Sequence, residues 1–149
     1  MWVCARLEEI SNDAVLAANY LRTLLAAAYQ IPFGLCKHEF VASAEALEET
    51  SGVRALDIAK ALLDLGFHPP TIYFPLSVKE CLLIEPTETE SRETLDRFAQ
   101  AMLAIAAQAL EDPERLLAAP VTTPVRRVDE TEAAREPKLR WVPEPAASG

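Results

Sequence analysis

One apolar seam near the N-terminus constrains the fold of this chain more than any other feature. From about Ala5 to Tyr29 the apolar residues recur in steps of three and four, at Leu7, Ile10, Ala14, Ala17, Leu21, Leu24 and Ala28. This spacing places them on one face of a long helix. Three of the seven are alanines, so the seam favours packing across a sheet or another helix over a coiled coil.

A strand is predicted after this helix. Pro32 and Gly34 interrupt the helical pattern. The stretch CKHEFVAS then alternates, which predicts a strand with these residues on one face: Cys36, His38, Phe40 and Ala42.

A second helix is predicted to begin around Thr50–Gly52, with an apolar stripe formed by Leu56, Ala59 and Leu63. Gly66 stands where a left-handed C-terminal cap belongs.

Two further strands and a helix complete the predicted fold. The stretch DLGFHPPTIYFPL contains a short strand over 71–76, and KECLLIEP supplies another that ends at Pro86. TETESRETLDRF has the hydroxyls and acids of a helix start, and its apolar periodicity continues to about Glu111. The order α-β-α-β-β-α predicts an α+β fold with a short antiparallel sheet.

The composition excludes several classes of protein. A formal charge of −9 leaves nothing to neutralise phosphates, so nucleic acid and anionic membranes are not expected partners. The N-terminus lacks a basic signal region, and no stretch is apolar enough for a membrane span. Three widely spaced cysteines, Cys4, Cys36 and Cys81, do not form a disulfide framework and indicate a reducing cytoplasm.

The character of the chain changes after Pro120. Residues 120–149 contain five of the eleven prolines, and their five basic residues balance five acidic ones. We therefore expect one domain over 1–119 and a proline-rich tail over 120–149, with 142–149 disordered. Arg126, Arg127 and Trp141 suit a tail that wraps over another surface, and a tail that is disordered throughout is the alternative.

The residues alone do not identify a catalytic site. No metal-binding spacing is present, so zinc would require Cys36, His38, His68 and Cys81 to converge. Cys36 and His38 also lack the orienting acid of a thiol enzyme. No cluster of glycines can hold a phosphate, and none of the four lysines has a convincing setting for a Schiff base.

Within the acidic cluster over 85–90, Glu85 is the acid that helix capping does not explain. It closes the apolar strand CLLIE just before Pro86, whereas Glu88 and Glu90 lie where acids stabilise a helix start. A carboxylate at the end of a buried strand usually has a partner. His68 flanks the neighbouring strand, so the two side chains are expected near one end of the sheet.

Five segments together resemble a known family. NYLRTLLAAAYQIPFG, CKHEFVAS, GVRALDIAKALLDLGFHPPTIYFPL, LLIEPTETESRETLDRF and TTPVRRVDETEAAREPKLRW occur in this order. They resemble the C-terminal part of subunit 2 of glycine dehydrogenase (decarboxylating), the pyridoxal-phosphate protein of the glycine cleavage system. The resemblance extends from about Asn19 to Trp141.

This resemblance implies the small C-terminal domain, with an extended tail, of a fold-type-I, aminotransferase-like enzyme. Such an enzyme decarboxylates glycine with pyridoxal phosphate and transfers the aminomethyl group to the lipoyl group of the carrier H protein. Its other partner is glycine dehydrogenase subunit 1. The family's Schiff-base lysine and phosphate cup have no counterpart in this sequence, so we expect a fragment that neither holds the cofactor nor turns over glycine alone.

The resemblance also suggests which residues face the cleft. The candidates are His68, Thr71, Tyr73, Glu85, Thr87 and Glu88, with His38 as a weaker one. They would shape the glycine pocket and the channel for the lipoyl arm, without an assigned proton transfer, and a structural role for each is the alternative. The alternative for the whole chain is a non-catalytic interaction module that docks on a partner subunit.

Overall fold

The computed structural model describes residues 2–143, with side chains from Arg6 onward. Its elements, in chain order, are α1 (Trp2–Leu25), β1 (Phe40–Ser43), α2 (Glu45–Ser51), α3 (Ala55–Asp64), β2 (Thr71–Ile72), β3 (Cys81–Ile84), α4 (Arg92–Glu111), α5 (Pro113–Leu117) and α6 (Glu130–Arg135). The three strands form one antiparallel sheet in the order β1-β3-β2. The predicted α+β class and antiparallel sheet are therefore confirmed.

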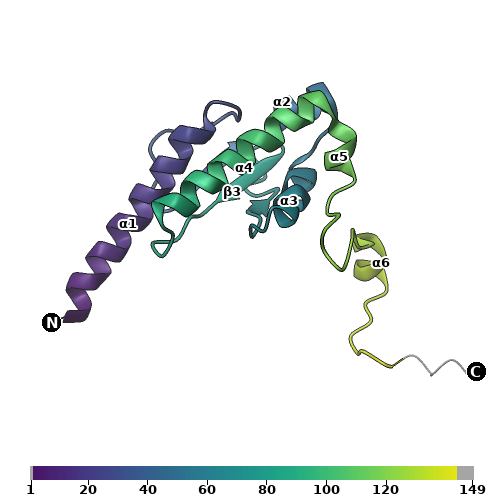
Figure 1. Cartoon of the computed structure of the whole chain (residues 1–149). Coiled ribbons are helices and arrows are strands. Elements are labelled where there is room, and N and C mark those ends of the chain that lie inside the picture. The colour runs from purple at the N-terminus through teal and green to yellow at the C-terminus, as the bar shows by residue number, and fades with distance from the viewer. Residues whose placement is uncertain (1, 144–149) are drawn as a thin grey trace, which may run out of the picture.

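Helices α1, α4 and α3 form a layer over this sheet (Figure 1). Helix α1 contacts both β1 and α4, while α3 contacts both α4 and β2. The core lies between the two layers. Its fully buried large side chains include Leu21, Leu25, Ile58, Leu82 and Met102.

Helix α4 follows directly from its sequence. The Ser91 hydroxyl accepts a hydrogen bond from the Thr94 N–H at 3.1 Å, which satisfies a donor that the first turn leaves free. Apolar residues then repeat in steps of four and three, and these are buried: Leu95, Ala99, Met102, Ala106 and Ala109. The predicted helix, ending at Glu111, is confirmed.

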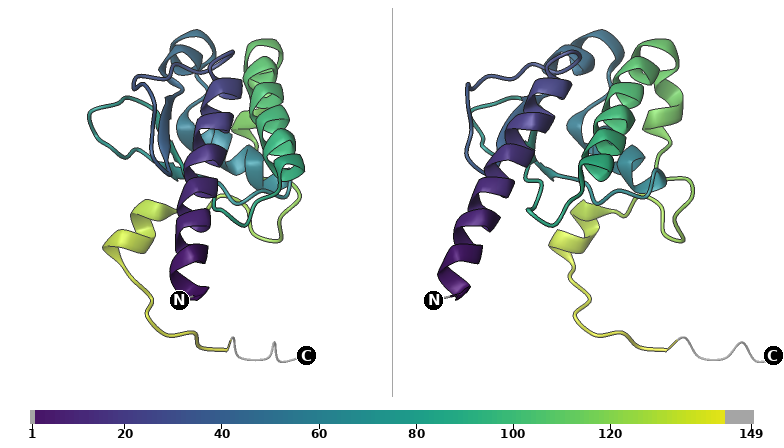
Figure 2. Two further views of the ribbon diagram at one scale, coloured as in Figure 1. Left: turned by 90° about the vertical axis from the view of Figure 1, so that its left-hand side faces the viewer. Right: turned by 60° about the vertical axis from the view of Figure 1, so that its left-hand side comes forward.

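The predicted seam on α1 is buried only at Ala17 and Leu21, whereas Leu24 is half-buried and Ala28 is exposed. Ala17 and Leu21 are buried, whereas Leu7 and Ile10 are 55% and 41% exposed. The N-terminal half extends beyond the body of the molecule (Figures 1 and 2). The helix also ends at Leu25, four residues earlier than predicted.

The predicted strand over 36–43 is too long, because β1 begins only at Phe40. The Asn19 side chain receives the Cys36 N–H at 3.2 Å and donates to the Cys36 carbonyl at 2.8 Å. Both main-chain groups of Cys36 are thereby occupied outside the sheet. Cys36 and His38 consequently do not share a strand face with Phe40.

The predicted helix around Thr50–Gly52 is two helices. Residues Glu45–Ser51 form α2, which ends where Gly52 takes a φ of 76°, and α3 begins at Ala55. Helix α2 buries only Leu47. A helix with a single buried residue has no repeating apolar pattern in its sequence, so the sequence did not predict it.

The end of α3 agrees with the prediction. Gly66 has a φ of 79°, a left-handed conformation that favours glycine. The stripe predicted on α3 is only partly right, because Ala59 is buried while Leu56 and Leu63 are half-buried.

The strand predicted over 71–76 contains only two paired residues, Thr71 and Ile72. Tyr73 has a φ of 61°, which turns the chain out of the extended conformation.

None of the helices in the described part of the chain combines the length and the apolar character that a membrane crossing requires.

Candidate functional site

A groove of about 370 Å³ lies beside the sheet, between α1, the N-terminal part of α4 and the connection that follows α3. The lining residues are Leu21, Phe67, His68, Pro69, Pro70, Thr71, Leu83, Ile84, Glu85, Pro86, Thr87, Glu90, Thr94, Leu95 and Phe98. Its volume is in the range of small-molecule sites.

The sheet register brings the two polar sides of this groove together. Strands β2 and β3 are antiparallel, with Thr71 opposite Leu83. The residues before Thr71 and those after β3 therefore lie at the same end of the sheet. As a result His68 and Glu85, which are 17 positions apart in the chain, line one groove.

Four of the seven candidate residues line this groove: His68, Thr71, Glu85 and Thr87. His38 lies close to its rim, because His38 Nε2 is 3.7 Å from Glu85 Oε1. The two side chains are 54% and 58% exposed, so the pair is open to water and to a ligand.

The other two candidates lie outside the groove lining. Glu88 is exposed in the turn before α4. Tyr73 lies under the guanidinium of Arg54, whose Cζ is 5.7 Å from the ring centroid. Burial of Tyr73 and the nearby charge of Glu80 raise the pKa of its hydroxyl, while Arg54 opposes that shift.

The groove lining also contains aromatic and polar residues that the sequence did not mark as candidates. Phe67 and Phe98 meet edge to face, with ring centroids 5.5 Å apart and planes at 80°, and both line the groove. Glu90 and Thr94 add a carboxylate and a hydroxyl. Phe98 and Glu90 were explained by helix periodicity and by the helix dipole, so their pattern held no separate functional signal.

The charge of the groove limits what it can hold. Its lining contains two carboxylates, Glu85 and Glu90, and neither a lysine nor an arginine. Such a lining disfavours a phosphate, which needs positive charge or several aimed N–H donors. Lys79, in contrast, is paired with Glu45 at 2.8 Å elsewhere on the surface. The groove by itself therefore does not fit pyridoxal phosphate.

The two cysteines whose side chains the structure describes, Cys36 and Cys81, are not arranged as a reactive or metal-binding pair. Cys81 is buried and its Sγ donates to the Phe74 carbonyl at 2.7 Å, whereas Cys36 is held by Asn19. Burial raises the pKa of both thiols. Among the side chains that the structure describes, no three potential ligands lie close enough to share a metal ion.

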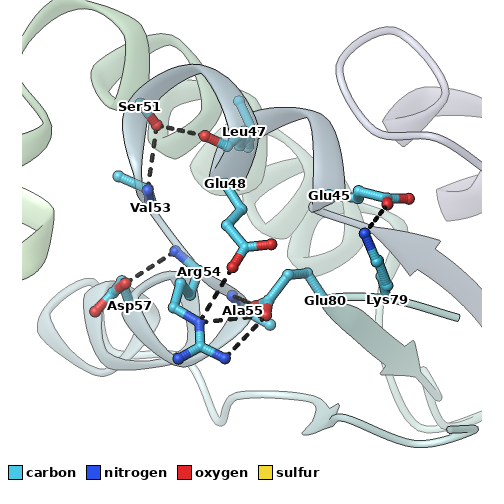
Figure 3. Close-up of polar contacts among 10 residues, drawn as sticks. All are labelled: Glu45, Leu47, Glu48, Ser51, Val53, Arg54, Ala55, Asp57, Lys79 and Glu80. Atoms are coloured by element: carbon cyan, nitrogen blue, oxygen red, sulfur yellow. Dashed lines mark hydrogen bonds and ion pairs between the residues drawn. The ribbon is translucent and has the colours of Figure 1, made fainter.

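A polar cluster supports the sheet from beside α3 (Figure 3). Glu80 is 7% exposed and accepts hydrogen bonds from the Ala55 N–H at 2.7 Å and from the Arg54 side chain at 3.2 and 3.3 Å. The carboxylate thus satisfies a free N–H at the start of α3 and neutralises Arg54. Because Arg54 also covers Tyr73, the cluster fixes the turn between β2 and β3.

The segment after α5 is attached to α3 at two points. Arg127 forms an ion pair with Asp57, with Nη2 at 2.7 Å from Oδ1, and its Nε donates a hydrogen bond to the Ala119 carbonyl at 2.7 Å. The Asp64 carboxylate accepts hydrogen bonds from the Val121 and Thr122 N–H groups at 2.7 to 2.8 Å. These contacts hold the chain against the domain as far as Arg127. The predicted disorder of 142–149 falls mostly on residues outside the described range.

Comparisons with known proteins identify this architecture. A family model described as the C-terminal domain of glycine dehydrogenase matches residues 10–118. A curated relative from Exiguobacterium sibiricum, named "Probable glycine dehydrogenase (decarboxylating) subunit 2", is 58% identical over 140 residues. Relatives with the same name from Desulforamulus reducens and Thermotoga maritima are 52% and 54% identical.

These matches cover most of this chain and a minor part of each relative. The alignments include 93% of this chain for the first two relatives and 91% for the third. They include only 28% of the Exiguobacterium protein and 29% of the other two.

Proposed function

The chain belongs to the family of glycine dehydrogenase C-terminal domains, and we propose that it forms the small-domain wall of a glycine-decarboxylating active site. In this proposal residues 1–119 form the small domain of a fold-type-I enzyme and residues 120–149 form its tail. The reaction decarboxylates glycine and transfers the aminomethyl group to the lipoyl arm of the H protein, in an assembly that includes glycine dehydrogenase subunit 1.

The observation that carries this proposal is the groove in a domain of this family. His68, Thr71, Glu85 and Thr87 line it from two chain segments, together with apolar residues that include Leu83. A hollow with an apolar floor and a few convergent polar groups is the usual form of a small-molecule site.

Pyridoxal phosphate supplies the electron sink for decarboxylation when it is bound in such an enzyme. The acidic lining described above does not fit its phosphate, and no lysine lines the groove. We therefore assign to this chain no contact with the phosphate and no Schiff base. Those contacts belong to the part of the relatives' polypeptide that this chain does not match.

The residues of this chain instead shape and close the site. Thr71 and Thr87 offer hydroxyls that donate or accept hydrogen bonds, and Glu85 offers an acceptor that suits an amine. Phe67 and Phe98 present aromatic surface that excludes water when the groove is covered. His38, whose Nε2 is 3.7 Å from Glu85 Oε1, adds another polar side chain at the rim.

A hybrid enzyme tests this proposal. The matched C-terminal region of the Thermotoga maritima relative is replaced by this chain from residue 10 onward, and the hybrid is combined with the other components of that glycine cleavage system. We expect exchange of labelled bicarbonate into the carboxyl of glycine, within about tenfold of the parent rate. A folded hybrid that retains pyridoxal phosphate but shows no exchange contradicts the proposal.

A further inference from the structure

The groove carries negative charge that no lysine or arginine of its lining balances. Glu85 directly follows β3, Glu90 directly precedes the Ser91 cap of α4, and both line the groove. In the described part of the chain neither carboxylate is ion-paired with a lysine or an arginine, and Glu85 has only His38 nearby, at 3.7 Å. A cleft lined by charge of one sign attracts ligands of the opposite sign.

The rest of the lining suits an organic cation better than a metal ion. Phe67 and Phe98 both line the groove, and the faces of aromatic rings attract ammonium groups. The hydroxyls of Thr71, Thr87 and Thr94 can accept hydrogen bonds from an N–H donor. Among the side chains that the structure describes, no three potential metal ligands lie together. The volume of about 370 Å³ also exceeds what a bare ion fills.

The same charge disfavours a ligand that carries a carboxylate beside its amine. An amino acid is a zwitterion at neutral pH, so Glu85 and Glu90 attract its ammonium group and repel its carboxylate. An amine without the carboxylate keeps the attraction alone. This difference bears on the proposed reaction, because decarboxylation removes the carboxylate of glycine and the transfer leaves its amine on a sulfur of the lipoyl group.

We propose that Glu85 and Glu90 bind the primary ammonium group of the aminomethylated lipoyl arm, so that this groove selects the decarboxylated amine over the amino acid. The identity of this ligand rests on the proposed function, whereas the preference for an ammonium group without a carboxylate follows from the groove alone. Phe67 and Phe98 contact the methylene and the thioether sulfur beside the amine. The carboxylate of glycine is bound outside this groove.

A matched pair of small molecules tests this preference on the 149-residue chain. Methylthioethylamine is a thioether with a primary ammonium group, and S-methylcysteine is the same molecule with a carboxylate added. Each is titrated into the isotope-labelled chain, and the amide signals are followed by nuclear magnetic resonance. We expect methylthioethylamine to shift the signals of Thr71, Leu83 and Glu85 and to bind about fivefold more tightly than S-methylcysteine. Equal affinities, or shifts confined to other parts of the chain, overturn the proposal.

A double variant assigns the preference to the two carboxylates. Glu85→Gln combined with Glu90→Gln keeps the size of both side chains and removes their charge, so the affinity for methylthioethylamine should fall about fivefold and the preference should disappear. Both residues are exposed, so the unfolding midpoint in urea should not change. Glu49→Gln, an exposed acid on α2 outside the groove lining, should retain the preference. A preference that survives the double substitution contradicts the proposal.

The binding and exchange results distinguish the two proposals. A chain that prefers methylthioethylamine, in a hybrid that shows no bicarbonate exchange, retains the ammonium preference and contradicts the proposed function. An active hybrid made from a chain without the preference does the reverse.

Discussion

Replacing Glu80 tests the physical account of the cluster that supports the turn between β2 and β3. The Glu80→Ala protein loses the acceptor of the Ala55 N–H, which lies 2.7 Å away in a residue that is fully buried. A buried donor without a partner costs roughly 1–3 kcal/mol. Arg54 loses the same carboxylate, but its side chain is 55% exposed and regains water, so it adds little.

The expected loss for Glu80→Ala is therefore about 2–3 kcal/mol in the free energy of unfolding. The positive φ of 42° at Glu80 is equally unfavourable for alanine and does not alter this expectation. At a typical slope of about 2 kcal/mol per molar urea, the midpoint falls by about 1 M or slightly more. Circular dichroism at increasing urea concentrations measures it.

A second acid in the same region provides the matched control (Figure 3). Glu45 pairs with Lys79 at 2.8 Å, which is shorter than either contact between Glu80 and Arg54. That pair is largely in water, with the Lys79 side chain 72% exposed, so Glu45→Ala should leave the midpoint unchanged. If the two substitutions shift the midpoint equally, burial does not determine the strength of these contacts and the reasoning is refuted.

Three further changes have defined outcomes. Tyr29→Phe removes a hydrogen bond from the buried hydroxyl to the Met102 carbonyl at 2.9 Å and should cost about 1 kcal/mol, measured by urea unfolding. Burial raises the pKa of Tyr29, so the unfolded state ionises first: stability should fall as the pH rises above 10, and the same variant should lessen that fall. Burial raises the pKa of Asp64, but the hydrogen bonds from Thr122 and Val121 outweigh burial and lower this pKa below its ordinary value of 3.8. The stabilisation from Asp64 is therefore complete above pH 3.8 and is lost as the pH falls through the lowered pKa, so Asp64→Asn should flatten the loss of stability at acid pH, measured by urea unfolding. Arg127→Met leaves the Asp57 carboxylate, which is 4% exposed, without its cation. This change should lower the free energy of unfolding by about 2–3 kcal/mol, measured by thermal unfolding. An unchanged thermal transition would show that the ion pair does not stabilise the fold.

The long periodic elements were the part of the fold that the sequence could predict. The repeat along α4, its Ser91 cap and the left-handed Gly66 all arise from local patterns. Helix α2 and the true start of β1 depend on contacts distant in the chain. Nothing near Cys36 indicates that Asn19, seventeen residues earlier, occupies both of its main-chain groups.

The candidate site was predictable to a similar extent. His68 and Glu85 flank neighbouring strands, so strand order alone brings them to one end of the sheet. Tyr73 was placed on the same strand as Thr71, but its positive φ ends the strand and its ring lies by Arg54 instead. Phe98 follows the apolar periodicity of α4, and helical periodicity cannot separate a core residue from one that lines a groove.

The domain also shows why sequence identity to a longer enzyme does not by itself locate chemistry. The groove has polar groups, apolar floor and a size suited to a small molecule, yet its charge is unsuited to a phosphorylated cofactor. The proposed role, a wall that closes over a site formed largely by another part of the polypeptide, is consistent with both properties.

The most direct test of that account is the steady-state kinetics of groove variants in the hybrid enzyme. Thr71→Val and Glu85→Gln are made in the groove, and Glu49→Gln, an exposed acid on α2, serves as the control. The account predicts that each groove variant lowers kcat/KM for glycine, or for the lipoylated carrier, by about tenfold or more while cofactor content and unfolding midpoint stay unchanged. Groove variants with the same kinetics as Glu49→Gln would contradict it.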